Sequence, residues 1–184
     1  MRLKTKGEDE AMNGLVHIYT GNGKGKTTSA IGLGIRAVGN GMKVLMVQFL
    51  KGRPSGEQTS LVKLKPNFEL YKNKQIDKFS WQLTLEETEE LRESTFHLFH
   101  YTIKHSESVN MIILDEIMAA ITTGLIDVKQ VSDFIKNKPS HLEVVLTGRN
   151  APDELIELAD YVSEINAVKH PMSSGIQARE GIEF

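Results

Sequence analysis

The chain has 184 residues, which is long enough for one well-cored domain and short for two. Its formal charge of −2 gives no field that would attract nucleic acid or an anionic membrane, and the absence of cysteine excludes disulfides, thiolate metal sites and cysteine nucleophiles. The content of 40% hydrophobic and 25% charged residues is typical of a soluble globular protein, and no apolar run is long enough to span a bilayer.

The N-terminal segment is polar and lacks the apolar core of a secretory signal. We expect residues 1–13 to form a flexible arm and residues 14–184 to form a single domain. With the lack of cysteine, this composition favours a cytoplasmic protein.

Short apolar strands are expected to alternate with helices in the first half of the domain. Gly39, Asn40 and Gly41 carry the signals that end the first helix. In chain order the sequence predicts a strand at Leu15–Tyr19, a helix from near Lys26 to Val38, a strand at Lys43–Phe49, a loop at Lys51–Gln58, a strand at Phe68–Tyr71 and a loop at Asn73–Leu83.

The second half continues the same alternation. Thr84 and Glu87 form a capping-box pattern that opens a long helix. After that helix, which reaches about His105, the sequence predicts a strand at Met111–Leu114, a helix at Asp127–Lys136 begun by an acidic cap, a strand at Val144–Thr147, a helix with Pro152 in its first turn, a strand at Tyr161–Ile165 and an irregular tail. The alternation predicts an α/β fold with a mostly parallel sheet and helices on both faces.

A glycine-rich run, TGNGKGKTT, lies at residues 20–28 between the first strand and the first helix. Its glycines let successive backbone N–H groups turn toward one point, and the helix start adds a partial positive charge. Lys26 can reach phosphate oxygens, and the Thr27 hydroxyl can bind Mg²⁺. Thr20 stands where the usual Gly-x4-Gly-Lys-Thr pattern has glycine, but Gly21 and Gly23 keep the backbone freedom. The run therefore predicts nucleotide binding; the alternative is a glycine-rich turn with exposed lysines.

An acidic pair, Asp115 and Glu116, ends the strand of the MIILDEI run. In a parallel sheet this carboxyl end faces the same edge as the phosphate loop. A carboxylate there can hold Mg²⁺ directly or through water, or can position water in a hydrolase. The sequence leaves open which carboxylate contacts the ion.

Seven segments resemble, in order, the P-loop type of cob(I)alamin adenosyltransferase, with a RecA-like P-loop NTPase fold. They are TGNGKGKTTSA (20–30), RAVGNG (36–41), VQFLKG (47–52), LDEI (114–117), LTGR (146–149), VKHP (168–171) and GIEF (181–184). The resemblance covers nearly the whole chain, and the ordered set is much more specific than the first motif alone.

The resemblance implies that Co(I) of a reduced corrinoid attacks C5′ of ATP and that triphosphate leaves. Backbone amides, Lys26 and Mg²⁺ would stabilise the leaving group, and Arg36 would reach the nucleotide. By resemblance the nucleotide-binding residues are Gly21, Asn22, Gly23, Lys24, Gly25, Lys26, Thr27, Thr28 and Arg149, and Thr27 and Glu116 lie near Mg²⁺. Asp115 is a further candidate metal residue because of its place at the end of the strand.

An aromatic pair, Phe79 and Trp81, resembles the family's Gly-Phe-Thr-Trp loop, with Lys78 in place of glycine. There the aromatic rings cover the lower face of the corrin and displace its axial base, which eases reduction of cobalt. The alternative is that both rings pack in the core. His170 lacks the Asp-x-His-x-x-Gly pattern of a cobalt ligand, so we expect a structural or peripheral role.

Three other functions remain open. A RecA-like ATP hydrolase would release ADP and phosphate, whereas a binding module would hold ATP or corrinoid without turnover. A nucleic-acid motor fits poorly with the balanced charge. The resemblance also implies a homodimer and a reductase that supplies electrons.

Overall fold

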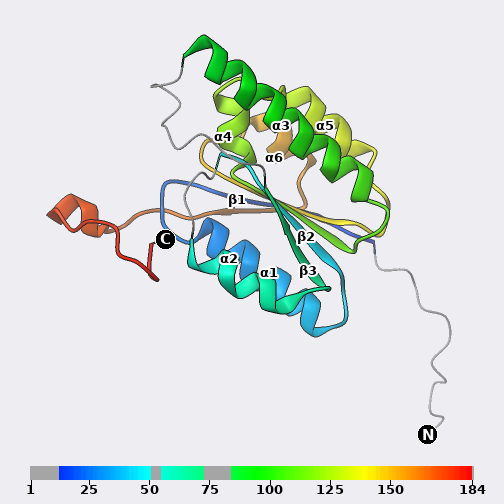
Figure 1. Ribbon diagram of the computed structural model, residues 1–184, viewed down its shortest axis with the longest axis horizontal. Coiled ribbons are helices and arrows are strands. Elements are labelled where there is room, and N and C mark those ends of the chain that lie inside the picture. The colour runs from blue at the N-terminus through cyan, green and yellow to red at the C-terminus, as the bar shows by residue number, and fades with distance from the viewer. Residues whose placement is uncertain (1–12, 51–54, 73–83, 184) are drawn as a thin grey trace, which may run out of the picture.

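The computed structural model describes residues 13–50, 55–72 and 84–183. A sheet lies between two layers of helices (Figure 1). Its strands are β1 Val16–Thr20, β2 Val44–Gln48, β3 Phe68–Tyr71, β4 Met111–Asp115, β5 Glu143–Thr147 and β6 Tyr161–Glu164. The helices are α1 Lys26–Gly39, α2 Gly56–Leu61, α3 Leu85–His105, α4 Ile117–Thr122, α5 Val128–Lys136 and α6 Asp153–Leu158.

The six described strands run in the order β3-β2-β4-β5-β1-β6, and every neighbouring pair is parallel. The sequence predicted a mostly parallel sheet, and the described sheet is parallel throughout. Because all strands point the same way, the loop after β1 and the acidic end of β4 meet at one edge. The register pairs Gln48 with Asp115 at that edge.

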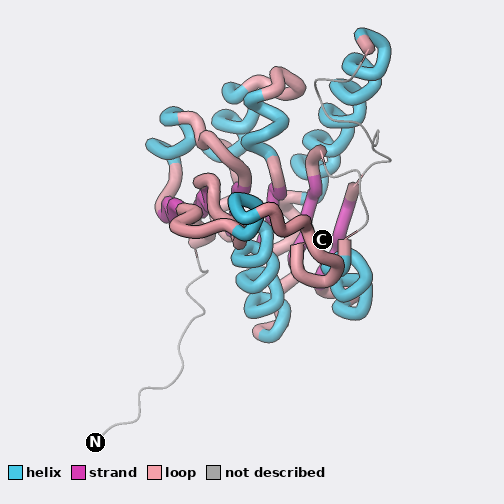
Figure 2. The backbone as a smooth tube through the Cα atoms, turned by 90° about the vertical axis from the view of Figure 1, so that its left-hand side faces the viewer, coloured by secondary structure: helices cyan, strands magenta, loops and turns pink. Residues whose placement is uncertain are grey.

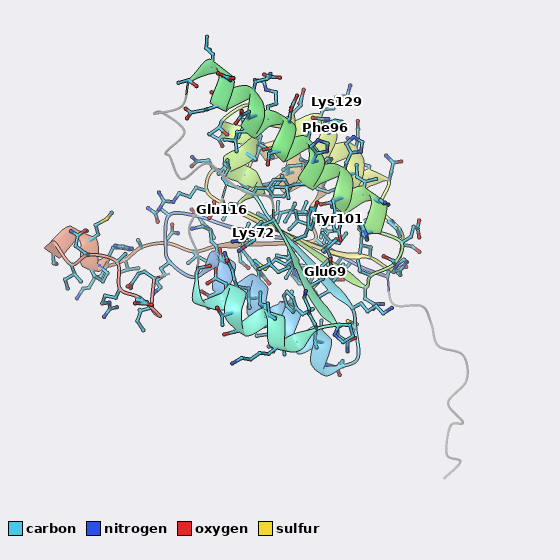
Figure 3. The ribbon with its side chains drawn as sticks, viewed as in Figure 1. Glu69, Lys72, Phe96, Tyr101, Glu116 and Lys129 are labelled. Atoms are coloured by element: carbon cyan, nitrogen blue, oxygen red, sulfur yellow. The ribbon has the colours of Figure 1, made fainter. Side chains whose placement is uncertain are left out.

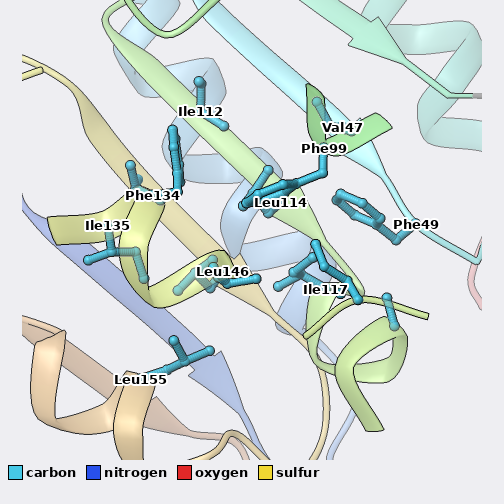
Figure 4. Close-up of a cluster of buried hydrophobic side chains, with 14 of the residues drawn as sticks. Val47, Phe49, Phe99, Ile112, Leu114, Ile117, Phe134, Ile135, Leu146 and Leu155 are labelled. Atoms are coloured by element: carbon cyan, nitrogen blue, oxygen red, sulfur yellow. The ribbon is translucent and has the colours of Figure 1, made fainter. Parts of the chain in front are cut away.

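Buried side chains fill both faces of the sheet, which explains why β2 and β4 consist almost entirely of apolar residues. On one face Leu45, Ile112 and Leu114 pack with α3, α4, α5 and α6 (Figure 4). On the other face Met46 and Ile113 pack with α1 and α2. Viewed from the side, the strands lie between these two helical layers (Figure 2).

The predicted helix caps are confirmed. Thr84 accepts a hydrogen bond from the backbone N–H of Glu87 at 3.2 Å, and the Glu87 carboxylate accepts one from the N–H of Thr84 at 2.9 Å. Asp127 caps α5, where its carboxylate accepts from the N–H of Lys129 at 2.9 Å. Pro152 is the residue before α6, so the prediction that it lies inside the first turn was one residue too early.

Two short helices were not predicted. The segment given as a loop, Lys51–Gln58, becomes helical from Gly56, where α2 begins. Helix α4 follows β4 after a single residue, Glu116, so its apolar residues continue the strand's apolar run without a visible change of period. In addition, β1 begins and ends one residue later than predicted, and the tail contains a short 3₁₀ helix at Pro171–Ser174.

None of the helices in the described ranges is both long enough and apolar enough to cross a membrane.

Candidate functional site

The phosphate loop joins β1 to α1 and takes a backbone shape that only glycine fits. Gly21 has a φ of 100°, and a Cβ there would lie 2.5 Å from the carbonyl oxygen of Ile165. A Cβ on Gly23 would lie 2.7 Å from the same oxygen, which accepts a 2.7 Å hydrogen bond from the N–H of Gly23. The chain leaving β6 therefore braces the loop from outside, and glycine allows the close approach.

Lys26 is buried in the first turn of α1, and its side chain extends back to the phosphate loop. Its ammonium donates hydrogen bonds to the carbonyl oxygens of Gly21 at 2.8 Å and Gly23 at 2.9 Å. Burial lowers the pKa of Lys26 and the positive charge of Arg149 adds to this, while Glu116 and Asp115 act in the opposite direction. The two hydrogen bonds hold the ammonium beside the loop at the cavity, where phosphate oxygens can replace the carbonyl acceptors.

Asp115 is completely buried and accepts hydrogen bonds from three side chains. The hydroxyls of Thr27 and Thr147 each donate to Oδ1 at 2.8 Å, and the amide of Gln48 donates to Oδ2 at 3.2 Å. These donors belong to α1, β5 and β2, so Asp115 ties three elements together behind the loop. Since the Thr27 proton points to Asp115, the Thr27 oxygen keeps its lone pairs for another partner.

Glu116 leaves the strand in a different direction from Asp115. Its φ of 62° is in the left-handed region, which is uncommon for a residue other than glycine. The backbone N–H of Glu116 donates to the Thr147 hydroxyl at 3.0 Å, which holds this turn in place. Its side chain lies at the sheet edge that carries the phosphate loop (Figure 3). The two adjacent acidic side chains therefore lie in different environments: Asp115 is buried in the interior, and Glu116 lines the cavity.

A cavity of about 730 Å³ opens over the phosphate loop. Three further parts of the chain complete its wall: α2, the turn after β5 with Arg149, and the C-terminal tail. The lining residues are Asn22, Gly23, Lys24, Gly25, Lys26, Thr27, Thr28, Ile31, Gly56, Glu57, Ser60, Glu116, Arg149, His170, Gly181, Ile182 and Glu183. The backbone amides, lysines and arginine together suit a polyanionic ligand.

Most of the predicted nucleotide residues line this cavity, including Arg149, which is distant in sequence. Gly21 and Asp115 do not line the cavity. Gly21 lies in the loop, where its carbonyl oxygen accepts a hydrogen bond from Lys26, and Asp115 is buried in the interior. Arg36 is in the last turn of α1, roughly 15 Å along the helix from Lys26, and is not part of the cavity wall. Phe79 and Trp81 lie outside the described residues.

His170 also contributes to the wall, and its Nδ1 accepts a 3.3 Å hydrogen bond from the N–H of Met172. It therefore caps the short 3₁₀ helix of the tail, in agreement with the structural role that the sequence suggested.

Sequence reasoning missed several residues of the site. Gln48 and Thr147 hold Asp115, and the tail residues 181–183 line the cavity. These residues occur within motifs that carried the family resemblance, VQFLKG, LTGR and GIEF, to which no role for them was attached. The cavity is also lined by Ile31 of α1 and by Gly56, Glu57 and Ser60 of α2, which lie in none of the motifs and gave no signal in the sequence.

The residues at the site suit Mg²⁺. Thr27 and Glu116 present oxygen atoms at the cavity, and oxygen is the ligand that this ion prefers. Among residues 13–50, 55–72 and 84–183, no three histidine, aspartate or glutamate side chains gather into a metal site. Mg²⁺ does not require such a cage, because it is commonly held by one or two protein oxygens together with substrate phosphates and water.

A family model and several curated relatives identify the family of this chain. Residues 12–184 match the family model of the ATP:corrinoid adenosyltransferase BtuR/CobO/CobP. A corrinoid adenosyltransferase of Sinorhizobium sp. is 36% identical over 174 residues, covering 93% of this chain and 80% of that protein. That of Escherichia coli K12 is 35% identical over 174 residues, covering 93% and 86%. The corrinoid adenosyltransferase CobA of Salmonella typhimurium is 32% identical over 172 residues, also covering 93% and 86%.

Proposed function

The chain belongs to the ATP:corrinoid adenosyltransferase family BtuR/CobO/CobP, and we propose that the cavity over its phosphate loop is where the transfer occurs. The protein is a transferase with ATP and a corrinoid as substrates, on the P-loop NTPase fold that the sequence predicted. The family does not favour the hydrolase or the binding module. We also propose that residues 14–184 act as one domain.

The reaction joins cobalt to carbon and releases triphosphate. Co(I) supplies an electron pair to C5′ of ATP, the C5′–O bond breaks, and its electrons leave on the triphosphate. No proton has to be removed from the nucleophile, so the site needs no general base. What the protein must supply is alignment of cobalt with C5′ and stabilisation of the departing charge.

The observation that carries the proposal is that three positive side chains meet the backbone amides of the phosphate loop, in a cavity that Glu57, Glu116 and Glu183 also line. Lys24, Lys26 and Arg149 line it together with the loop amides at the start of α1. Such groups stabilise the triphosphate increasingly as negative charge builds up on it, which lowers the barrier to its departure. Lys26 would exchange the carbonyls of Gly21 and Gly23 for phosphate oxygens.

For the metal we propose Thr27 and Glu116 as the protein ligands. When bound, Mg²⁺ would neutralise part of the triphosphate charge. Asp115 would act through Thr27, because its carboxylate already accepts hydrogen bonds from Thr27, Thr147 and Gln48 in the interior. This choice uses the oxygens that line the cavity and leaves the buried carboxylate in its structural position.

The corrinoid contacts stay proposals by resemblance. Phe79 and Trp81 would lie against the lower face of the corrin, and loss of the axial donor would ease reduction of cobalt to Co(I). Contact of Arg36 with the nucleotide is likewise a prediction. We further propose a cytoplasmic homodimer supplied with electrons by a reductase.

The direct test is to mix the protein with ATP, Mg²⁺ and chemically reduced cobalamin. We expect a light-sensitive adenosyl product and one equivalent of triphosphate. Lys26→Ala should reduce the rate by at least about 100-fold, because it removes a preorganised positive charge. Lys129→Ala is a matched control, since Lys129 is exposed on α5, away from the cavity (Figure 3). ADP and phosphate as products, or an unaffected Lys26→Ala enzyme, would contradict the proposal.

A further inference from the structure

The C-terminal tail returns to the phosphate loop after leaving the sheet. Beyond β6 the chain runs outward, turns through its short 3₁₀ helix and comes back, so that the C-terminus lies near the start of α1 (Figure 1). The contact is made by Lys24, whose ammonium donates to the carbonyl oxygen of Ile182 at 2.7 Å and to Oε1 of Glu183 at 3.2 Å. A lysine of the phosphate loop is thus bound by the tail.

Few contacts hold this part of the chain. In residues 169–183, the hydrogen bonds to the rest of the described chain are those two from Lys24, and Val168 just before them donates its backbone N–H to the carbonyl oxygen of Asn166 at 3.1 Å. The others stay inside the tail, as between Arg179 and Glu183. Its apolar side chains are largely exposed, with 93% of Val168 and 71% of Met172 accessible. A segment with so little buried surface can detach without disturbing the core.

The Glu183 carboxylate, which accepts a hydrogen bond from Lys24, resembles a phosphate group in its charge and its acceptor oxygens. The Glu183 carboxylate is an anion with two acceptor oxygens, and hydrogen bonds from Arg179 lower its pKa to about 2, so it is charged at neutral pH. It also lines the same cavity as Lys26 and Thr27. An anion that reached the loop from a bound nucleotide would meet the same ammonium.

We propose that residues 179–183 form a C-terminal strap whose Glu183 carboxylate occupies Lys24 in the nucleotide-free protein and is displaced by the triphosphate of ATP. The strap is an internal competitor for the phosphate site and opens when that site fills. This inference rests on the proposed function, because it requires ATP to bind at the phosphate loop.

The energetics favour displacement. The side chains of Lys24 and Glu183 are 48% and 21% exposed, and ion pairs that are open to water are weak. The triphosphate carries several charges and gains the loop amides as well, so it competes strongly for the ammonium. Arg179 and Glu183 form an ion pair within the strap, so the Glu183 carboxylate would keep a positive partner after it leaves Lys24. Conversely, triphosphate leaving after transfer would let the strap return.

The experiment compares ATP affinity, measured by titration calorimetry with Mg²⁺ but without corrinoid, in three proteins. Glu183→Gln removes the competing charge, and Glu180→Gln makes the same change in charge on a neighbouring exposed residue of the tail. We expect ATP to bind roughly two- to fivefold more tightly to Glu183→Gln than to the wild type, as for loss of a partly exposed ion pair. We expect Glu180→Gln to match the wild type.

Trypsin cleavage after Arg179 provides a second readout. ATP should increase the rate at which wild-type protein releases residues 180–184, since the strap opens. Slower release with ATP, or unchanged or weaker ATP binding by Glu183→Gln, would overturn the proposal. A wild type that fails to bind ATP would instead overturn the proposed function, so the two failures are distinguishable.

Discussion

The hydroxyl of Thr27 donates a 2.8 Å hydrogen bond to Oδ1 of Asp115. This bond joins the first turn of α1 to the last residue of β4, two elements separated by 88 positions in the sequence. It fixes the Thr27 oxygen relative to the phosphate loop and uses its proton. Asp115 therefore orients Thr27, the proposed ligand of Mg²⁺, from the interior of the protein.

Replacing Asp115 by alanine should destabilise the fold. The change leaves the fully buried Thr147 and Gln48, and the half-buried Thr27, without their shared acceptor. We expect the free energy of unfolding to fall by about 2–4 kcal/mol, measured by chemical denaturation. Asp133→Ala, an exposed change on α5, should stay within about 0.5 kcal/mol of the wild type. Equal stability of the two variants would show that Asp115 does not hold these elements together.

Two glycines of α1 should respond oppositely to alanine. A Cβ on Gly32 meets nothing within 4 Å, so the higher helix propensity of alanine should stabilise the protein by about 0.5–1 kcal/mol. A Cβ on Gly34 would lie 2.6 Å from the ring of the buried Phe68, and we expect a loss of about 1–3 kcal/mol. Thermal or chemical unfolding of both variants tests this, and a stabilised Gly34→Ala would refute the close packing of α1 on the sheet.

Replacing Glu116 by glutamine should weaken the binding of Mg²⁺. The variant keeps the shape of the side chain but removes its charge, and a neutral amide oxygen is a poorer ligand for a hard cation. We expect the Mg²⁺ concentration for half-maximal transfer to rise about tenfold, as for removal of a group that supports a metal site. Glu57→Gln is the control, because Glu57 lines the same cavity from α2. An equal rise in both variants would indicate a general charge effect.

Tyr101 should ionise later than an ordinary tyrosine. Burial raises its pKa from 10.0 to about 12, assisted by its hydrogen bond to Glu69, which accepts from the Tyr101 hydroxyl at 2.8 Å (Figure 3). Because the raised pKa favours the protonated form of the folded protein, its contribution to stability is complete below pH 10.0 and is lost as the pH rises to about 12.

A titration that follows phenolate absorbance tests this assignment. Tyr101→Phe should remove the transition near pH 12, and Glu69→Gln should move it to lower pH. Tyr161→Phe, a change on the exposed strand β6, should leave that transition in place. Persistence of the transition in Tyr101→Phe would mean that another tyrosine is responsible.

Local patterns explain what could be predicted from the sequence. The strands are dense in apolar residues, and the caps at Thr84 and Asp127 depend on residues only two or three positions away. The phosphate loop is also local, since its glycines and Lys26 lie within six residues. Helix α4 escaped prediction because it is six residues long and follows a buried strand almost directly. Such a short helix is stabilised by packing against the rest of the fold, and it is too short to show a clear helical periodicity in the sequence.

By itself the sequence determined the parallel α/β arrangement, the phosphate loop and the acidic pair after β4, because each depends on residue types at short spacing. Tertiary structure decided which acidic residue lines the cavity: Glu116, with its positive φ, lies at the cavity, while Thr27, Thr147 and Gln48 bond Asp115 in the interior. It also brought Glu183 to Lys24 across 159 positions. Such contacts join distant segments that only the folded sheet brings together, so no short-range pattern could encode them.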